Sequence, residues 1–197
     1  MPPEDLASLL GSRLCHDLIG PVGAIGNGVE LLLAAPDSAA DDIAMLSETV
    51  RALTARLRFY RVAFGLSQGS QPQPRSEIQS ILADLYPSGR IGIDWHSPGQ
   101  IPRDEVKAAF LLVLCGEQSI RGTGHIRVLQ DEAGWSITLS SPRLLPEPRL
   151  WSLLDDPMQA RDLAAGEVQF ALAGLQLAKL ARRPDLEAGH EALRVSF

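Results

Sequence analysis

The chain has 197 residues, of which 45% are hydrophobic, and its 18 Lys and Arg against 24 Asp and Glu give a net charge of −6. This length suits one large domain or two small ones with hydrophobic cores, while the acidic excess argues against general nucleic-acid binding, which needs a basic face opposite the phosphates. Because no uninterrupted apolar run approaches the roughly 18–20 residues that cross a bilayer, and the N-terminus is acidic where a signal peptide is basic, we expect a cytoplasmic protein without nucleic-acid or membrane partners.

Residues 1–66 are predicted to form a helical hairpin. One helix runs from about residue 4 to residue 34, and Asp37 or Ser38 in the following turn can cap a second helix. Apolar residues of the second helix alternate three and four positions apart, which is typical of the seam of a helical bundle. They are Ile43, Leu46, Val50, Leu53, Leu57, Tyr60 and Phe64. A hairpin alone cannot enclose a core, so we expect a homodimer that forms a four-helix bundle.

A second domain is predicted after a linker at residues 67–75, where a polar stretch rich in Gly, Pro, Ser and Gln interrupts the helical pattern. Residues 76–197 are predicted to form an α/β sandwich, which places the chain in the α+β class. Helices are expected at about 76–85, 103–119 and 167–182, with strands at 91–96, 125–130, 135–140 and 193–197. Alternation in these strands predicts a sheet with helices covering one face.

His16 is the candidate catalytic residue because it lies on the polar face of the first predicted helix. At about 100° per residue, Gly20, Gly23 and Asn27 follow on the same side at successive turns. Each helical glycine costs roughly 1 kcal/mol relative to Ala, so a flat surface for the close approach of another protein explains them better than packing does. Imidazole can accept and release a phosphoryl group, and Asp17 could orient the ring or accept its proton.

The opposite side of the first helix is predicted to be a buried apolar stripe. It consists of Leu14, Leu18, Val22, Ile25, Val29 and Leu32.

The segment around His16 has the pattern His-Asp-x-x-x-Pro, which resembles the phosphoacceptor box of histidine kinases. Over residues 12–31 the sequence closely resembles the ChpT family of alphaproteobacterial histidine phosphotransferases. This resemblance implies a dimerisation domain like that of histidine kinases, followed by a degenerate version of their ATP-binding domain. Kinases usually carry Thr or Asn before the proline, where this chain has Gly20, so the resemblance does not extend to phosphatase activity.

The sequence lacks the nucleotide motifs of the kinase domain. The helix that matches the kinase asparagine helix, residues 105–118, contains no Asn, and Ser-Pro-Arg-Leu at 141–144 replaces the expected Asp-x-Gly-x-Gly loop. Without these groups, ligands for Mg²⁺ and phosphate are missing. We therefore expect no bound cofactor and no ATP-dependent kinase activity, and we interpret the second domain as a docking surface.

The resemblance implies that His16 accepts a phosphoryl group from the receiver domain of a hybrid histidine kinase and passes it to response regulators. Mg²⁺ would be held by the partner's receiver domain, and Asp17 would tune the imidazole. Partner contacts are assigned to Arg13, Gly20, Gly23 and Asn27. Two alternatives stay open: a non-catalytic dimeric adaptor or inhibitor of a histidine kinase, and a true ATP-dependent kinase.

A group of arginines on the second helix has two interpretations. Arg51, Arg56, Arg58 and Arg61 could meet an acidic receiver domain, or they could form a solvated face that balances nearby acidic residues.

Overall fold

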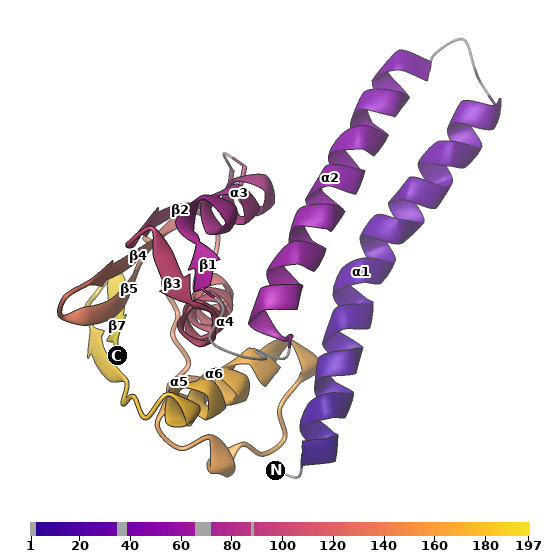
Figure 1. Ribbon diagram of the computed structural model, residues 1–197. Helices are drawn as coiled ribbons and strands as arrows, with labels where there is room; N and C mark the ends of the chain where they lie inside the picture. The colour runs from indigo at the N-terminus through magenta and orange to yellow at the C-terminus, as the bar shows by residue number, and fades with distance from the viewer. Residues whose placement is uncertain (1–2, 35–38, 66–71, 88) are drawn as a thin grey trace.

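A computed structural model describes residues 3–34, 39–65, 72–87 and 89–197. Two long helices, α1 (Pro3–Ala34) and α2 (Ala39–Ala63), run antiparallel as a hairpin whose far half projects away from the rest of the chain (Figure 1). The predicted hairpin is confirmed, and α1 matches its predicted range to within a residue. The turn between the helices, with the predicted caps at Asp37 and Ser38, lies outside the described residues.

The rest of the chain is an α/β sandwich, so the predicted fold class is also confirmed. Its sheet has the order β2-β4-β5-β7-β6, with β2 and β4 parallel and all other neighbours antiparallel. The strands are β2 (Ile91–His96), β4 (Gly124–Asp131), β5 (Gly134–Ser140), β6 (Asp185–Ala188) and β7 (Ala192–Ser196). Helices α3 (Arg75–Leu85), α4 (Arg103–Ser119) and α6 (Val168–Lys179) lie between this sheet and the hairpin (Figure 1).

Several short elements were not predicted. Strand β1 (Pro72–Pro74) pairs with β3 (Gln100–Pro102), so the last part of the predicted 67–75 linker is a strand, and α3 begins at Arg75. Prolines are tolerated in such a strand because a two-stranded sheet has only edges. Helix α5 (Pro148–Trp151), short 3₁₀ turns after it, and the exposed strand β6 carry too little periodicity to be recognised.

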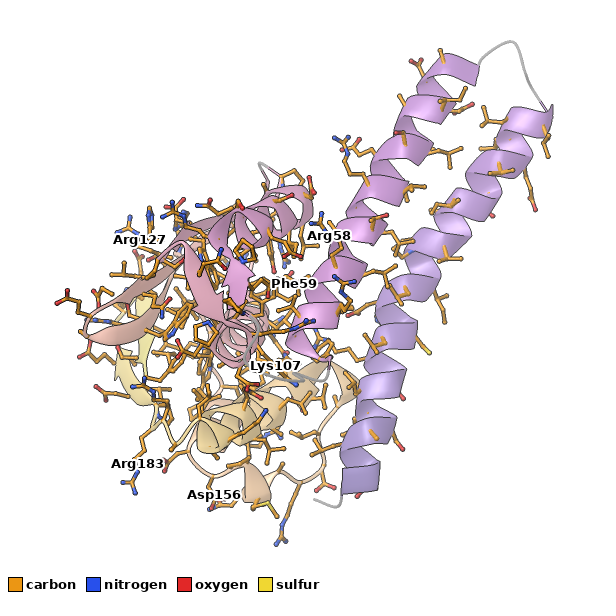
Figure 2. The ribbon with its side chains drawn as sticks, in the orientation of Figure 1. Arg58, Phe59, Lys107, Arg127, Asp156 and Arg183 are labelled. Carbon is orange, nitrogen blue, oxygen red and sulfur yellow. The ribbon has the colours of Figure 1, made fainter. Side chains whose placement is uncertain are left out.

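One continuous hydrophobic core joins α2 to the α/β part. Phe59 is fully buried and stacks on Phe110 of α4, with ring centroids 4.3 Å apart, and Phe110 in turn meets Trp95 of β2 edge-on. Figure 2 shows Phe59 on α2 directed toward the α/β part. At the end of α2, Lys107 Nζ donates a hydrogen bond to the Gly65 carbonyl at 2.9 Å. The C-terminal half of α2 is therefore fixed to α3 and α4.

The predicted seam of α2 is only partly buried within the chain, which corrects the expectation. Ile43, Val50 and Leu57 are exposed, although Leu46 packs against the buried Gly28 of α1. The face that packs on the α/β part lies on the other side of α2. It consists of Ala55, Phe59, Val62 and Ala63.

The predicted apolar stripe of α1 is likewise only partly covered: Val22 and Val29 are exposed, and its other members are half-buried. By length and composition alone, the segment Asp5–Ala34 would be able to cross a membrane, with a mean hydropathy of 1.2 and 6% of the tested window buried. The exposed apolar residues of both helices thus form surface that the single chain leaves uncovered.

Candidate functional site

His16 projects from α1 with 89% of its side chain exposed. Its Nδ1 lies 3.3 Å from Oδ1 of Asp17. With a proton on Nδ1 donated to this carboxylate, Nε2 keeps its lone pair and points to the opposite side of the ring. This arrangement offers one nucleophilic nitrogen to an incoming protein.

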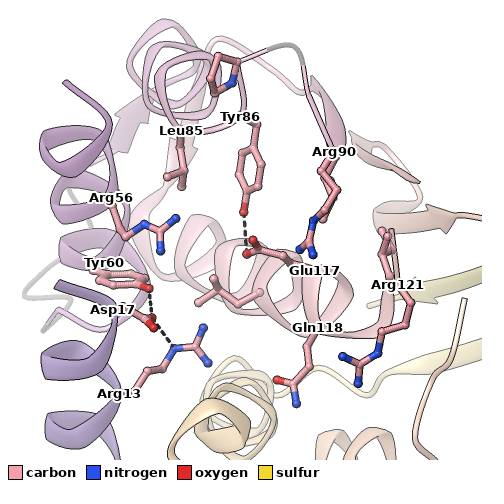
Figure 3. A pocket seen from close by; sticks show the side chains of 14 residues that line it. Arg13, Asp17, Arg56, Tyr60, Leu85, Tyr86, Arg90, Glu117, Gln118 and Arg121 are labelled. Carbon is pink, nitrogen blue, oxygen red and sulfur yellow. Dashed lines mark hydrogen bonds and ion pairs between the residues drawn. The ribbon is translucent and has the colours of Figure 1, made fainter. Parts of the chain in front are cut away.

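Asp17 is held from two helices, which fixes the group that contacts His16. The hydroxyl of Tyr60, on α2, donates a hydrogen bond to Asp17 Oδ2, and Arg13 Nε lies 3.5 Å from the same oxygen (Figure 3). Burial, and next the hydrogen bond to Asp17, raise the pKa of Tyr60 to about 12. The hydroxyl therefore stays protonated at neutral pH and remains a donor to the carboxylate.

Arg13, one of the four predicted partner contacts, is engaged within the chain. Its side chain is only 12% exposed, and Nη1 donates to the Gly166 carbonyl at 2.8 Å and to Gln169 Oε1. Arg13 and Asp17 are four residues apart and share the side of α1 that faces the α/β part. The structure thus makes Arg13 a link between α1, Asp17 and the start of α6.

The other three predicted contact residues lie on open surface. Gly20, Gly23 and Asn27 are exposed, and a Cβ built on Gly20 or Gly23 would meet nothing within 4 Å. The helical periodicity places them on the same side of α1 as His16. They leave a flat strip of backbone beside the imidazole.

The arginines of α2 do not share one surface. Arg58 Nη1 lies 3.7 Å from Asp84 Oδ2, whereas Arg56 lines a cleft between the hairpin and the α/β part. Arg51 and Arg61 are exposed. Arg58 is therefore paired within the chain and Arg56 faces the cleft, while Arg51 and Arg61 lie on open surface.

Sequence reasoning missed Tyr60 as a site residue and placed it in the bundle seam. One signal was available, because a hydroxyl on an otherwise apolar seam usually finds a hydrogen-bond partner when it is buried. The partner itself lies 43 residues away in the sequence.

Among the described residues, no group of three or more His, Cys, Asp or Glu side chains is placed to hold a metal ion.

Replacing Tyr60 with phenylalanine is expected to lower the free energy of unfolding at pH 7 by about 1.5–3 kcal/mol. The reason is that the Asp17 carboxylate loses the hydrogen bond that the Tyr60 hydroxyl donates to it, and hydrogen bonds to a charged group are strong. For the phosphoryl transfer that the resemblance implies, we also expect a severalfold lower rate, since the carboxylate beside His16 is less firmly placed. Urea unfolding and single-turnover transfer measure the two effects. Unchanged stability and unchanged rate would show that this hydroxyl does not support the site.

The same variant gives a prediction about alkaline pH. An unfolded tyrosine has a pKa of about 10, whereas Tyr60 has a folded-state pKa of about 12. Between these values the folded chain keeps a proton that the unfolded chain loses, so stability falls as pH rises, by up to about 1.4 kcal/mol per pH unit. The Tyr60→Phe protein should lack this component of the slope between pH 10 and 12. Equal slopes in both proteins would contradict the assignment.

Comparisons with known proteins agree over most of the chain. Residues 75–192 match the family described as "Histidine phosphotransferase C-terminal domain". The chain is 34% identical to "Protein phosphotransferase ChpT" of Brucella abortus (strain 2308) over 173 residues, which cover 84% of this chain and 81% of that protein. A solved "Structure of a Bacterial Phosphotransferase" is 27% identical, with a TM-score of 0.78 over 100% of this chain and 97% of the other. The Acinetobacter baumannii histidine kinase AdeS aligns at 10% identity with a TM-score of 0.46, over 91% of this chain and 94% of the kinase.

Proposed function

The chain belongs to the histidine phosphotransferase family, and from this premise we propose that it relays phosphoryl groups through His16. The observation that carries the proposal is the exposed imidazole whose Nδ1 lies 3.3 Å from a carboxylate held by Tyr60 and Arg13. An exposed histidine without such support would be an ordinary surface residue. The fixed carboxylate accepts the proton of Nδ1 in a hydrogen bond and leaves Nε2 as the nucleophile.

In the proposed reaction, Nε2 of His16 attacks the phosphorus of an aspartyl phosphate on a donor receiver domain. The bond between phosphorus and the aspartate oxygen breaks, and the aspartate leaves as a carboxylate. The phosphorylated ring gains a positive charge, which the Asp17 carboxylate stabilises. A second receiver aspartate then attacks the same phosphorus and regenerates neutral His16.

The proposed partners are the receiver domain of a hybrid histidine kinase as donor and response regulators as acceptors. Their receiver domains would hold the Mg²⁺, so the chain itself would need no cofactor. We propose that it has no ATP-dependent kinase activity, since the end of α4 carries no Asn and its polar side chains are engaged within the chain. Glu117 accepts a hydrogen bond from Tyr86, and Gln118 accepts one from Gln169. A cytoplasmic location follows from these partners, which are phosphorylated where ATP is available.

The strip formed by Gly20, Gly23 and Asn27 is the proposed contact for a receiver domain. Replacing Gly23 with glutamine is expected to slow transfer about tenfold to a hundredfold, because the new side chain occupies the space the partner needs. The same change should raise stability by up to about 1 kcal/mol, since it removes a helical glycine and has open space around it.

The matched control is Gly11→Gln on the same helix. Gly11 also has nothing within 4 Å of a built Cβ, but it lies about 140° around the helix from His16. Its substitution should give the same gain in stability with unchanged transfer. Equal transfer rates in both variants would show that the strip does not contact the receiver domain.

We propose a homodimer in which two hairpins form a four-helix bundle. The support is a pair of exposed apolar rows at heptad spacing, Val22 and Val29 on α1 and Ile43, Val50 and Leu57 on α2. Each row lies open in the single chain, and a second copy would cover both.

Replacing Val50 with glutamate is therefore expected to convert the dimer to a monomer at micromolar concentration, because the carboxylate would be buried in the bundle. Light scattering after size-exclusion chromatography measures the mass directly. Ala52→Glu, on the opposite and exposed side of α2, is the control that should remain dimeric. A monomeric wild-type protein would contradict the bundle.

The test of the relay uses three purified proteins. A donor receiver domain carrying a labelled aspartyl phosphate is freed of nucleotide and mixed with the chain, and a second receiver is then added. The proposal expects label on the chain that is lost in acid and kept in base, followed by label on the second receiver. If the label never reaches the chain from several candidate donors, the dimeric adaptor or kinase inhibitor becomes the better account.

A further inference from the structure

A cleft of about 370 Å³ between the hairpin and the α/β part is lined by several positively charged side chains. Four arginines line it, from four different segments (Figure 3): Arg13 on α1, Arg56 on α2, Arg90 before β2 and Arg121 after α4. We propose that this cleft binds a small anion that carries a phosphate or diphosphate group.

The cleft has a surplus of positive charge. Its two carboxylates, Asp17 and Glu117, oppose four guanidinium groups, which leaves a net charge of +2 in a chain whose net charge is −6. Both carboxylates already accept hydrogen bonds from tyrosines, Tyr60 and Tyr86 respectively. They are therefore only partly available to neutralise the arginines.

Three of the four guanidinium groups have no partner in the described part of the chain. Arg13 is engaged with Asp17, Gly166 and Gln169. Within the described residues, no hydrogen bond or ion pair holds the side chains of Arg56, Arg90 and Arg121. Cations that face one small space repel each other. A bound anion would remove this cost.

The backbones that carry two of these arginines are fixed. The Arg90 carbonyl accepts a hydrogen bond from Gly124 N at 3.0 Å, and Arg121 N donates to the Arg143 carbonyl at 2.9 Å. Both residues thus extend from positions set by neighbouring segments rather than from free loops. A site with fixed supports loses less entropy when it orders two long side chains around a ligand.

The chemistry and size of the cleft favour a phosphate group over other anions. Guanidinium groups pair with phosphate oxygens through two parallel hydrogen bonds, and several arginines around one small volume suit a multiply charged group. The volume falls within the range of small-molecule sites and is too small to admit a helix about 10 Å wide. The cleft also faces inward on the Asp17 side of α1, whereas the exposed imidazole of His16 does not line it.

Inorganic pyrophosphate is the first probe, titrated calorimetrically into the full-length chain at low salt. We expect saturable binding of one pyrophosphate per chain, weakened at least tenfold by Arg90→Ala and by Arg121→Ala. Both residues are exposed and their side chains have no partners among the described residues, so these variants should keep the wild-type melting temperature. Arg127→Ala on β4, an exposed arginine outside the cleft, should bind like wild type.

Parallel titrations with ADP and AMP identify the source of the phosphate. Equal binding of ADP and pyrophosphate assigns the site to the diphosphate group alone, whereas tighter binding of ADP assigns it to a nucleotide. The absence of saturable binding would overturn the proposal, as would an equal loss of affinity in Arg127→Ala. His16→Gln should bind pyrophosphate normally, so this test and the relay test can fail independently.

Discussion

Replacing His16 with glutamine is expected to abolish phosphoryl transfer to the chain, with a fall of at least about a thousandfold in labelled product. The amide keeps a polar side chain of similar size but has no nitrogen lone pair able to attack phosphorus. Stability should stay within about 0.5 kcal/mol of wild type, because the side chain is 89% exposed and its contact is with the neighbouring Asp17. Label transfer and urea unfolding measure the two outcomes.

The chain offers a closely matched control in His190. This histidine is 96% exposed and also lies beside an acidic residue, with Nδ1 4.0 Å from Glu191 Oε1. Among the described residues, no side chain from a second element holds that carboxylate in the way that Tyr60 holds Asp17. His190→Gln should therefore transfer at the wild-type rate. Loss of transfer in both variants would mean that histidine content, rather than the site on α1, determines the reaction.

Replacing Phe59 with alanine is expected to lower the free energy of unfolding by about 3–5 kcal/mol, the largest stability effect that we predict. The ring is fully buried and stacked on Phe110, and it joins α2 to the core of the α/β part. Its loss leaves a cavity between rigid helices that cannot close without moving α2. Urea denaturation at neutral pH measures the cost.

Met45→Ala is the control for this prediction. Met45 lies on a similar side of α2 as Phe59, but it is exposed and nearer the far end of the hairpin. Its truncation should cost no more than about 0.5 kcal/mol. A cost below 1 kcal/mol for Phe59→Ala would mean that the hairpin and the α/β part do not share a core.

Elements with strong periodicity and with clear start or stop residues were predictable from the sequence. The range of α4 was predicted as 103–119 and that of β2 as 91–96, and both match the structure. Proline at position 102 favours a helix start directly after it, and the alternation in β2 spans the whole strand. By contrast, β1 and β6 have three and four residues, which is too short for any period to show.

The role of each apolar face was harder to predict than its existence. A heptad row such as Ile43, Val50 and Leu57 shows that a helix must pack, but not whether its partner lies in the same chain. The structure buries Phe59 on the opposite side of α2 and leaves the heptad row open. Periodicity contains no information about which of two apolar faces meets the α/β part.

The candidate site was predictable where it depends on one helix and not where it depends on several. His16, Asp17 and the glycine strip follow from the 100° rotation per residue. Tyr60 and the partners of Arg13 come from segments 43 to 156 residues away, and only the folded chain brings them to α1. The hydrogen bonds of Arg13 to Gly166 and Gln169 were therefore not predictable from the first helix alone.

The central claim, that His16 carries the phosphoryl group, is tested most directly by locating that group. The chain is phosphorylated by a nucleotide-free donor receiver, digested at alkaline pH, and sequenced by tandem mass spectrometry without exposure to acid. The account predicts one phosphorylated peptide, with the group on the His16 imidazole. Phosphate on another residue, or a phosphorylated donor that loses its label to water while the chain stays unmodified, would contradict it.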